Sequence, residues 1–213
     1  MTMKRFVSIL VMPALAAATL GILLGVYFVT AGVSARSQPG PLETLAAHTV
    51  RNIAIRTRVR GLANAVSVND AVIAEGRDHF ADHCASCHAN DGSGNTEMGR
   101  GLYPKAPDMR LPATQNLSDA ELFYIIENGV RFTGMPGWST GTPAGEESTW
   151  HLVHFIRHLP QLTPEEVETM EALNPKSPEE IRQDIEAEQF LNGADPKPAA
   201  PSPDAHGQGG HHE

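Results

Sequence analysis

The two cysteines of this 213-residue chain, Cys84 and Cys87, are separated by two residues, and His88 follows the second directly. Two thiols at this spacing can add to neighbouring vinyl groups of a porphyrin, and the next residue can place its imidazole beneath the ring. The pattern therefore predicts one covalently attached haem, with Cys84 and Cys87 as attachment points and His88 as an iron ligand.

Three other uses of a Cys-x-x-Cys pair compete with this interpretation. A structural zinc site ordinarily has four ligands, and the chain has no further cysteine. A thioredoxin-like dithiol is expected within a βαβ unit, which the pattern here does not predict. A plain disulfide between Cys84 and Cys87 stays open as an alternative, although it gives His88 no role.

A second candidate iron ligand is Met135, which stands in Gly134-Met135-Pro136 shortly before Trp138. Methionine more often fills gaps in a core than binds a metal. Here, however, a glycine and a proline would hold the backbone close to a ring, and a His/Met ligand pair raises the reduction potential of haem iron. Met98 lies only ten residues beyond His88, and neither Met109 nor Met170 has a comparable setting.

Helix signals surround these candidates. Ser67 or Asn69 can cap a helix over about residues 70–83, which leads into the cysteine motif. Residues four apart share a helix face, and three such residues lie here: Gly76, Phe80 and Cys84. A second helix begins at Ser118 with a capping box to Glu121 and stops at Asn128-Gly129.

The order of these motifs resembles the monohaem class I c-type cytochromes over about residues 67–160. The resemblance implies an all-α fold around one covalent haem c, in which Gly76 lets the last helix cross closely and Phe155 meets the glycine. Residues 102–108 are similar to the family's loop beneath the haem, where a carbonyl at Pro104 or Pro107 would accept a hydrogen bond from His88. Residues 139–148 lengthen the stretch before the last helix, 150–155.

The N-terminal segment is apolar. Lys4 and Arg5 precede 28 residues without a charged side chain, from Phe6 to Val33. This length exceeds that of a signal-peptide core and predicts a membrane anchor over residues 1–35. A cleaved signal is the alternative, because small residues precede Arg36. Because haem c is attached outside the cytoplasm, the resemblance implies a bacterial cytoplasmic membrane protein with its haem domain on the periplasmic side.

The remaining segments differ in charge. Residues 36–66 form a linker or docking segment in which 42–62 fits a helix or a strand, and its arginines either face solvent or dock onto the acidic body or anionic lipid. Residues 67–162 form the haem domain, with six Lys and Arg against twelve Asp and Glu. Two acidic helices follow in 163–193, and a disordered histidine-containing tail in 194–213. His151, His154 and His158 share a helix face that could bind copper or zinc, but we expect a solvated face because no carboxylate or cysteine completes a site.

With His88 and Met135 both bound, the iron has no open position for oxygen chemistry. The sequence therefore predicts a membrane-tethered one-electron carrier with redox proteins as partners and no catalytic residues of its own. The alternative is a cytochrome subunit of a periplasmic dehydrogenase or terminal oxidase, and a haem sensor or peroxidase would require Met135 to dissociate. The acidic balance disfavours nucleic acid as a partner.

Overall fold

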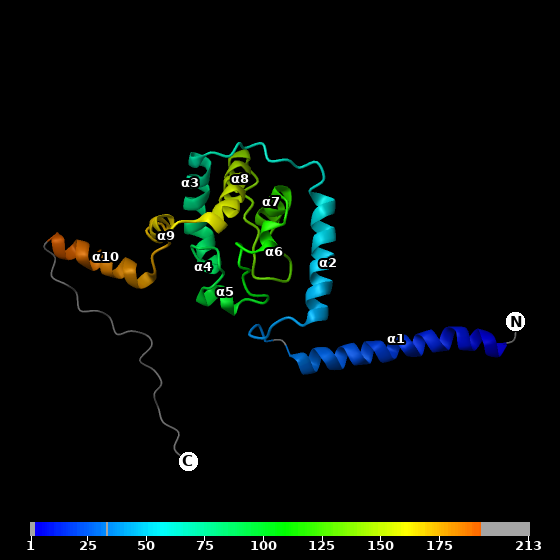
Figure 1. The fold of residues 1–213 in the computed structure, drawn as a ribbon. Helices are drawn as coiled ribbons and strands as arrows, with labels where there is room; N and C mark the ends of the chain where they lie inside the picture. The colour runs from blue at the N-terminus through cyan, green and yellow to red at the C-terminus, as the bar shows by residue number, and fades with distance from the viewer. Residues whose placement is uncertain (1–2, 33, 193–213) are drawn as a thin grey trace, which may run out of the picture. The chain divides into compact units, whose positions relative to one another are not determined.

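The structure is a computed structural model and describes residues 3–32 and 34–192 (Figure 1). These residues form helices and no strand, as the all-α prediction requires. The described chain divides into two compact units, one ending at Asn174 and the other beginning at Pro175. The helices are α1 (Met3–Ala31), α2 (Pro41–Arg58), α3 (Asp70–His79), α4 (Ala85–His88), α5 (Glu97–Gly101), α6 (Pro112–Gln115), α7 (Asp119–Asn128), α8 (Pro143–His158), α9 (Pro164–Glu171) and α10 (Pro178–Leu191).

The core is organised around the crossing of α3 and α8, which lie side by side in Figure 1. A Cβ added to Gly76 would lie 2.2 Å from the His151 carbonyl oxygen and 2.9 Å from the Phe155 Cβ. The ring centroids of Phe80 and Phe155 are 5.2 Å apart, and both side chains are almost fully buried. The predicted crossing at Gly76, with Phe155 against the glycine, is confirmed.

Helix α7 packs on α8 through its apolar side, with Leu122 and Ile126 buried. The rings of Phe123 and Trp150 stack with centroids 4.1 Å apart. The predicted capping box is present at the start of α7: the Glu121 amide donates to Ser118 Oγ at 3.2 Å, and the Ser118 amide donates to Glu121 Oε2 at 2.7 Å. The helix ends at Gly129, which has a φ of +65°.

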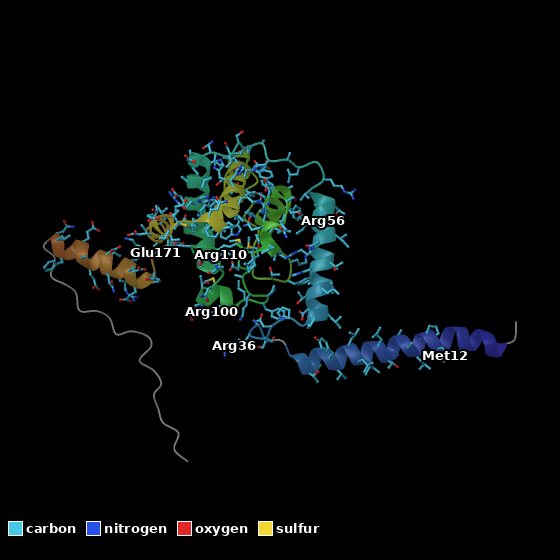
Figure 2. All side chains as sticks on the ribbon, in the orientation of Figure 1. Met12, Arg36, Arg56, Arg100, Arg110 and Glu171 are labelled. Atoms are coloured by element: carbon cyan, nitrogen blue, oxygen red, sulfur yellow. The ribbon has the colours of Figure 1, made fainter. Side chains whose placement is uncertain are left out.

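Residues 42–62, for which helix and strand were both open, contain α2, so the strand alternative is wrong. The helix runs beside α7 (Figure 1), buries Ile55 and leaves Ile53 exposed. Arg56, labelled in Figure 2, donates from Nε to Glu121 Oε1 at 3.2 Å. Arg56 therefore docks onto the acidic body, while its side chain stays largely exposed, as expected for a solvated face.

Helix α8 begins earlier than expected. Pro143 occupies its first turn, and Thr142 caps it by accepting a hydrogen bond from the Gly145 amide at 3.2 Å. Residues 143–148, six of the ten residues in the stretch 139–148 that was expected to lengthen a loop, therefore belong to the helix. The two acidic helices expected in 163–193 are present as α9 and α10, and Met170 of α9 is fully buried. The tail predicted for 194–213 lies outside the described residues.

The long helix α1 carries exposed apolar side chains, including Leu20, Ile22 and Leu23. Among the described residues, no helix combines the length and the hydropathy needed to cross a membrane.

Candidate functional site

The cysteine motif follows a change in helix type. Asn69 caps α3, accepting a hydrogen bond from the Val72 amide at 3.0 Å, and α3 ends at His79. A π-helical turn over Phe80–Cys84 then leads into α4, so the helix predicted over about residues 70–83 is present, but its last turn is π-helical. A π-helical turn holds more residues than an α-helical one, so it rotates the motif relative to α3, and such turns often occur at functional sites.

Cys84 and Cys87 are free thiols, and both are half-buried. Burial and, to a lesser extent, the neighbouring Cys87 raise the pKa of the Cys84 thiol to about 12. Reactive dithiols of the thioredoxin kind need the opposite, a lowered pKa that favours thiolate. The environment of Cys84 therefore disfavours the redox-dithiol alternative, and the free thiols do not form the disulfide that was the other alternative.

The imidazole of His88 is held in its neutral form. Burial lowers the pKa of His88, and an interaction with the backbone of Pro107 partly opposes this shift. Because proline has no N–H, this interaction involves the Pro107 carbonyl. His88 Nδ1 is buried and has no partner at ordinary hydrogen-bond geometry among the described residues. The structure thus places Pro107, and not Pro104, against the ring, and the neutral ring keeps a nitrogen lone pair for a metal.

Two glycines keep the backbone around His88 close-packed. The Gly94 amide donates to the His88 carbonyl at 2.8 Å, and a Cβ on Gly94 would lie 3.1 Å from the Pro107 carbonyl oxygen. A Cβ on Gly99 would lie 2.2 Å from the Cys87 carbonyl oxygen. Side chains at these two positions would push the Pro107 segment and the motif apart.

Met135 stands in a loop that leaves α7 and returns to its end. A Cβ on Gly129 would lie 2.6 Å from the Met135 carbonyl oxygen, and one on Gly137 would lie 2.9 Å from the carbonyl carbon of Asn128. The Trp138 amide closes the loop by donating to the Ile126 carbonyl at 2.9 Å. Residues 129–138 therefore form a pinched loop, in which Met135 is half-buried.

One further segment contacts both candidate ligand segments. The side chain of Leu102 packs on Gly134, where an added Cβ would lie 2.5 Å from Leu102 Cδ2. Leu102 begins the loop 102–108, which also contains the Pro107 carbonyl beside His88. The segments of His88 and Met135 therefore lie against the same loop, although they are far apart in the sequence.

The other methionines considered as ligands have different surroundings. Met109 and Met170 are buried in the hydrophobic core, and Met98 on α5 is 57% exposed. Two free thiols one turn apart, a neutral imidazole and a half-buried thioether are the donors that a covalently held haem requires, so the residues present fit this group. No group of three or more His, Cys, Asp or Glu that could hold a metal ion occurs among the described residues.

The histidines of α8 do not form the solvated face that was expected. His151 is 9% exposed and its Nδ1 lies 2.8 Å from Glu75 Oε2. His154 Nε2 lies 2.9 Å from the Val66 carbonyl oxygen, and His158 Nε2 lies 2.9 Å from Glu166 Oε1. Each ring therefore joins α8 to another segment of its unit. The tail histidines lie outside the described residues.

The sequence interpretation missed two features of the site. The π-helical turn before the motif has no sequence signal that we can identify. Phe132, three residues before Met135, has a φ of +63° and is 92% exposed. A positive φ is usually signalled by glycine or asparagine, and residues 130–133 contain neither.

Residues 71–156 match the protein family described as cytochrome C oxidase, cbb3-type, subunit III. The matched range begins in α3 and ends in α8. It contains the cysteine motif, the loop 102–108 and the pinched loop that carries Met135.

Proposed function

We propose that the chain transfers single electrons between redox proteins through a haem held by Cys84, Cys87, His88 and Met135. It is a monohaem c-type cytochrome, which binds haem c covalently. The two cysteines would form the thioether bonds. His88 and Met135 would supply the two protein ligands of the iron. Haem iron supplies a one-electron couple whose potential the two axial ligands set.

The observation that carries the ligand assignment is the loop 102–108, which contacts the segments of both axial ligands. At one end Leu102 packs on Gly134, and near the other the Pro107 carbonyl interacts with the His88 ring. A ligand pair needs two donors at fixed positions on opposite faces of one ring. A shared supporting loop provides such a frame.

The surrounding residues keep both ligands in place. The Pro107 carbonyl would orient the His88 ring and increase its basicity. The Met135 amide donates to Thr133 Oγ1 at 3.1 Å, and its carbonyl accepts from the Val130 amide at 3.1 Å. Both backbone groups of Met135 are therefore satisfied within its own loop. A ligand held this way moves little when the iron changes charge, which suits electron transfer better than catalysis at an open iron.

The experiment that tests the assignment is Met135→Ala in the haem-loaded protein. Loss of the thioether should abolish the weak near-infrared band of the oxidised form, lower the reduction potential and let carbon monoxide bind the reduced iron. Met98→Ala, at the exposed methionine of α5, is the matched control and should change none of these. An unchanged spectrum in Met135→Ala, or ready binding of carbon monoxide by the wild type, would contradict Met135 as the second ligand.

The finer localisation is also a proposal. We infer that residues 1–35 tether the domain to the bacterial cytoplasmic membrane, with the haem domain on the periplasmic side. The support is the uncharged run from Phe6 to Val33 and the exposed apolar side chains of α1. A tether would confine electron exchange to partners at the same membrane surface.

A second candidate is a permanent subunit of a terminal oxidase or dehydrogenase. The description of the matched family, which names an oxidase subunit, favours it. Purification of the full chain from detergent-solubilised membranes distinguishes the two. A subunit should co-purify with a fixed stoichiometric partner, whereas a carrier should elute alone and exchange electrons as a monomer.

A further inference from the structure

Phe132 is 92% exposed, more than any other large apolar side chain that the structure describes. Its φ of +63° also places it among the few residues other than glycine that adopt a positive φ in the described chain. For an L-residue this conformation is unfavourable by about 1–2 kcal/mol. Phe132 therefore has an unfavourable backbone conformation, and burial of its aromatic ring does not compensate for it.

The strain comes from a tight turn. The Thr133 amide donates to the Val130 carbonyl at 3.2 Å, which closes a four-residue turn with Phe132 at its third position. This position takes a positive φ in a type II turn and is ordinarily glycine or asparagine. Since a smaller residue would suit the turn better, local stability does not explain phenylalanine here. Residues held in such conformations concentrate at functional sites.

The turn is joined to Met135 by hydrogen bonds. Thr133 Oγ1 donates to the Val130 carbonyl at 2.8 Å and accepts from the Met135 amide at 3.1 Å. The Val130 amide donates to the Met135 carbonyl at 3.1 Å. These hydrogen bonds therefore fix the backbone that carries the exposed Phe132 ring relative to Met135.

We propose that Phe132 is the aromatic anchor through which an electron-transfer protein docks beside the Met135 loop. This inference rests on the proposed function. Aromatic side chains, phenylalanine included, are enriched in the buried cores of protein interfaces, and pre-organisation lowers the cost of binding. An apolar contact here would also exclude water from the surface of the Met135 loop.

Charge indicates the chemistry of the partner. Residues 67–162 carry six Lys and Arg against twelve Asp and Glu. A negatively charged domain attracts a positively charged surface over distances longer than a contact. The partner that fits is a redox protein with a net positive charge and an apolar hollow over its own redox centre.

In the test, the source cells produce the Phe132→Asn variant in place of the native chain. Asparagine removes the ring and tolerates positive φ, so the melting temperature of the haem-loaded protein should stay equal or rise by a few degrees. In native membranes, the rate at which the cytochrome is oxidised after an oxygen pulse, or re-reduced by its donor, should fall about tenfold or more. Phe132→Tyr, which keeps the ring, should restore the rate.

Control measurements distinguish a loss of docking from a change at the haem itself. Oxidation of the purified variant by ferricyanide should match the wild type, because a small oxidant needs no docking site. Leu45→Asn, at an exposed apolar residue of α2, should leave the membrane rates unchanged.

Unchanged oxidation and re-reduction in Phe132→Asn would overturn the proposal. A shifted spectrum, or an equal loss of rate with ferricyanide, would also overturn it, because Phe132 would then act on the haem. The Met135→Ala spectrum tests the proposed function separately from all of these outcomes.

Discussion

Gly76 of α3 and His151 of α8 are in direct backbone contact. The Cβ of any other residue at position 76 would lie 2.2 Å from the His151 carbonyl oxygen, less than any real contact allows. The neighbouring Phe80–Phe155 ring pair and the contact between His151 Nδ1 and Glu75 Oε2 depend on the same crossing. This contact therefore sets the distance between the helix that leads into the cysteine motif and the helix that closes the domain.

The first prediction follows from this contact. Gly76→Ala should destabilise the haem-loaded protein by about 2–3 kcal/mol, because the clash involves backbone and the helices must separate. Denaturant unfolding followed by circular dichroism measures the change. Gly101→Ala is the matched control: this glycine ends α5, and an added Cβ there would meet nothing within 4 Å. Equal stability of the two variants would contradict the close crossing.

The second prediction concerns covalent attachment. Cys84→Ala and Cys87→Ala should each lose one thioether bond, and the double variant should retain no haem after extraction with acidified acetone. Ser86→Ala, which changes the residue preceding Cys87, should keep both bonds. Haem bound to the denatured double variant would show that attachment uses other residues.

The third prediction concerns Glu121 and pH. Burial raises the pKa of this carboxyl, but hydrogen bonds from Ser118 and Arg56 outweigh it, and the net pKa lies below the ordinary value. The ionised carboxyl therefore stabilises the fold above the unfolded-state pKa of about 4.5, and this contribution is lost as the pH falls through the lower folded-state pKa.

Glu121→Gln should consequently unfold more easily than the wild type at pH 7, by about 1 kcal/mol. Its stability should also change less with pH between about pH 5 and pH 3, because the lost carboxyl no longer takes up a proton there. Thermal unfolding across this range measures both effects. Glu168→Gln, on the exposed surface of α9, should follow the wild-type curve. Parallel curves for Glu121→Gln and the wild type would rule out this contribution.

The fourth prediction concerns the proposed tether. If residues 1–35 are retained in a membrane, the mature chain should sediment with membranes and resist carbonate washing. Leu23→Arg, within the apolar run, should weaken this retention because a charge is costly in the bilayer. A soluble mature protein that begins near Arg36 would identify the segment as a cleaved signal.

Short-range chemistry made several features predictable. The Cys-x-x-Cys-His spacing of residues 84–88 acts within one or two helical turns, as does the capping box of Ser118 and Glu121. Gly76 and Phe155 were placed correctly through the family resemblance, and the contact between them is confirmed. The interpretation of Met135 as a ligand stays a prediction, although the pinched loop around it agrees with its flanking glycines.

Other features depended on partners far along the chain. Residues 42–62 fit a helix or a strand until Arg56 is seen to bind Glu121, which is 65 positions away. The histidines of α8 looked solvated because their partners, such as Asn64 at 90 positions from His154, lie outside any local window.

By itself, the sequence determined one haem-attachment motif and the starts of α3 and α7, because those properties depend on residues a few positions apart, and its order of motifs implied the all-α fold through the family resemblance. Only the tertiary structure decided that Pro107 faces His88, that α2 docks on α7 and that Phe132 is displayed on a strained turn. Each of these depends on packing between distant segments or on a hydrogen-bonded loop whose residues carry no turn signal, and no local pattern encodes such contacts.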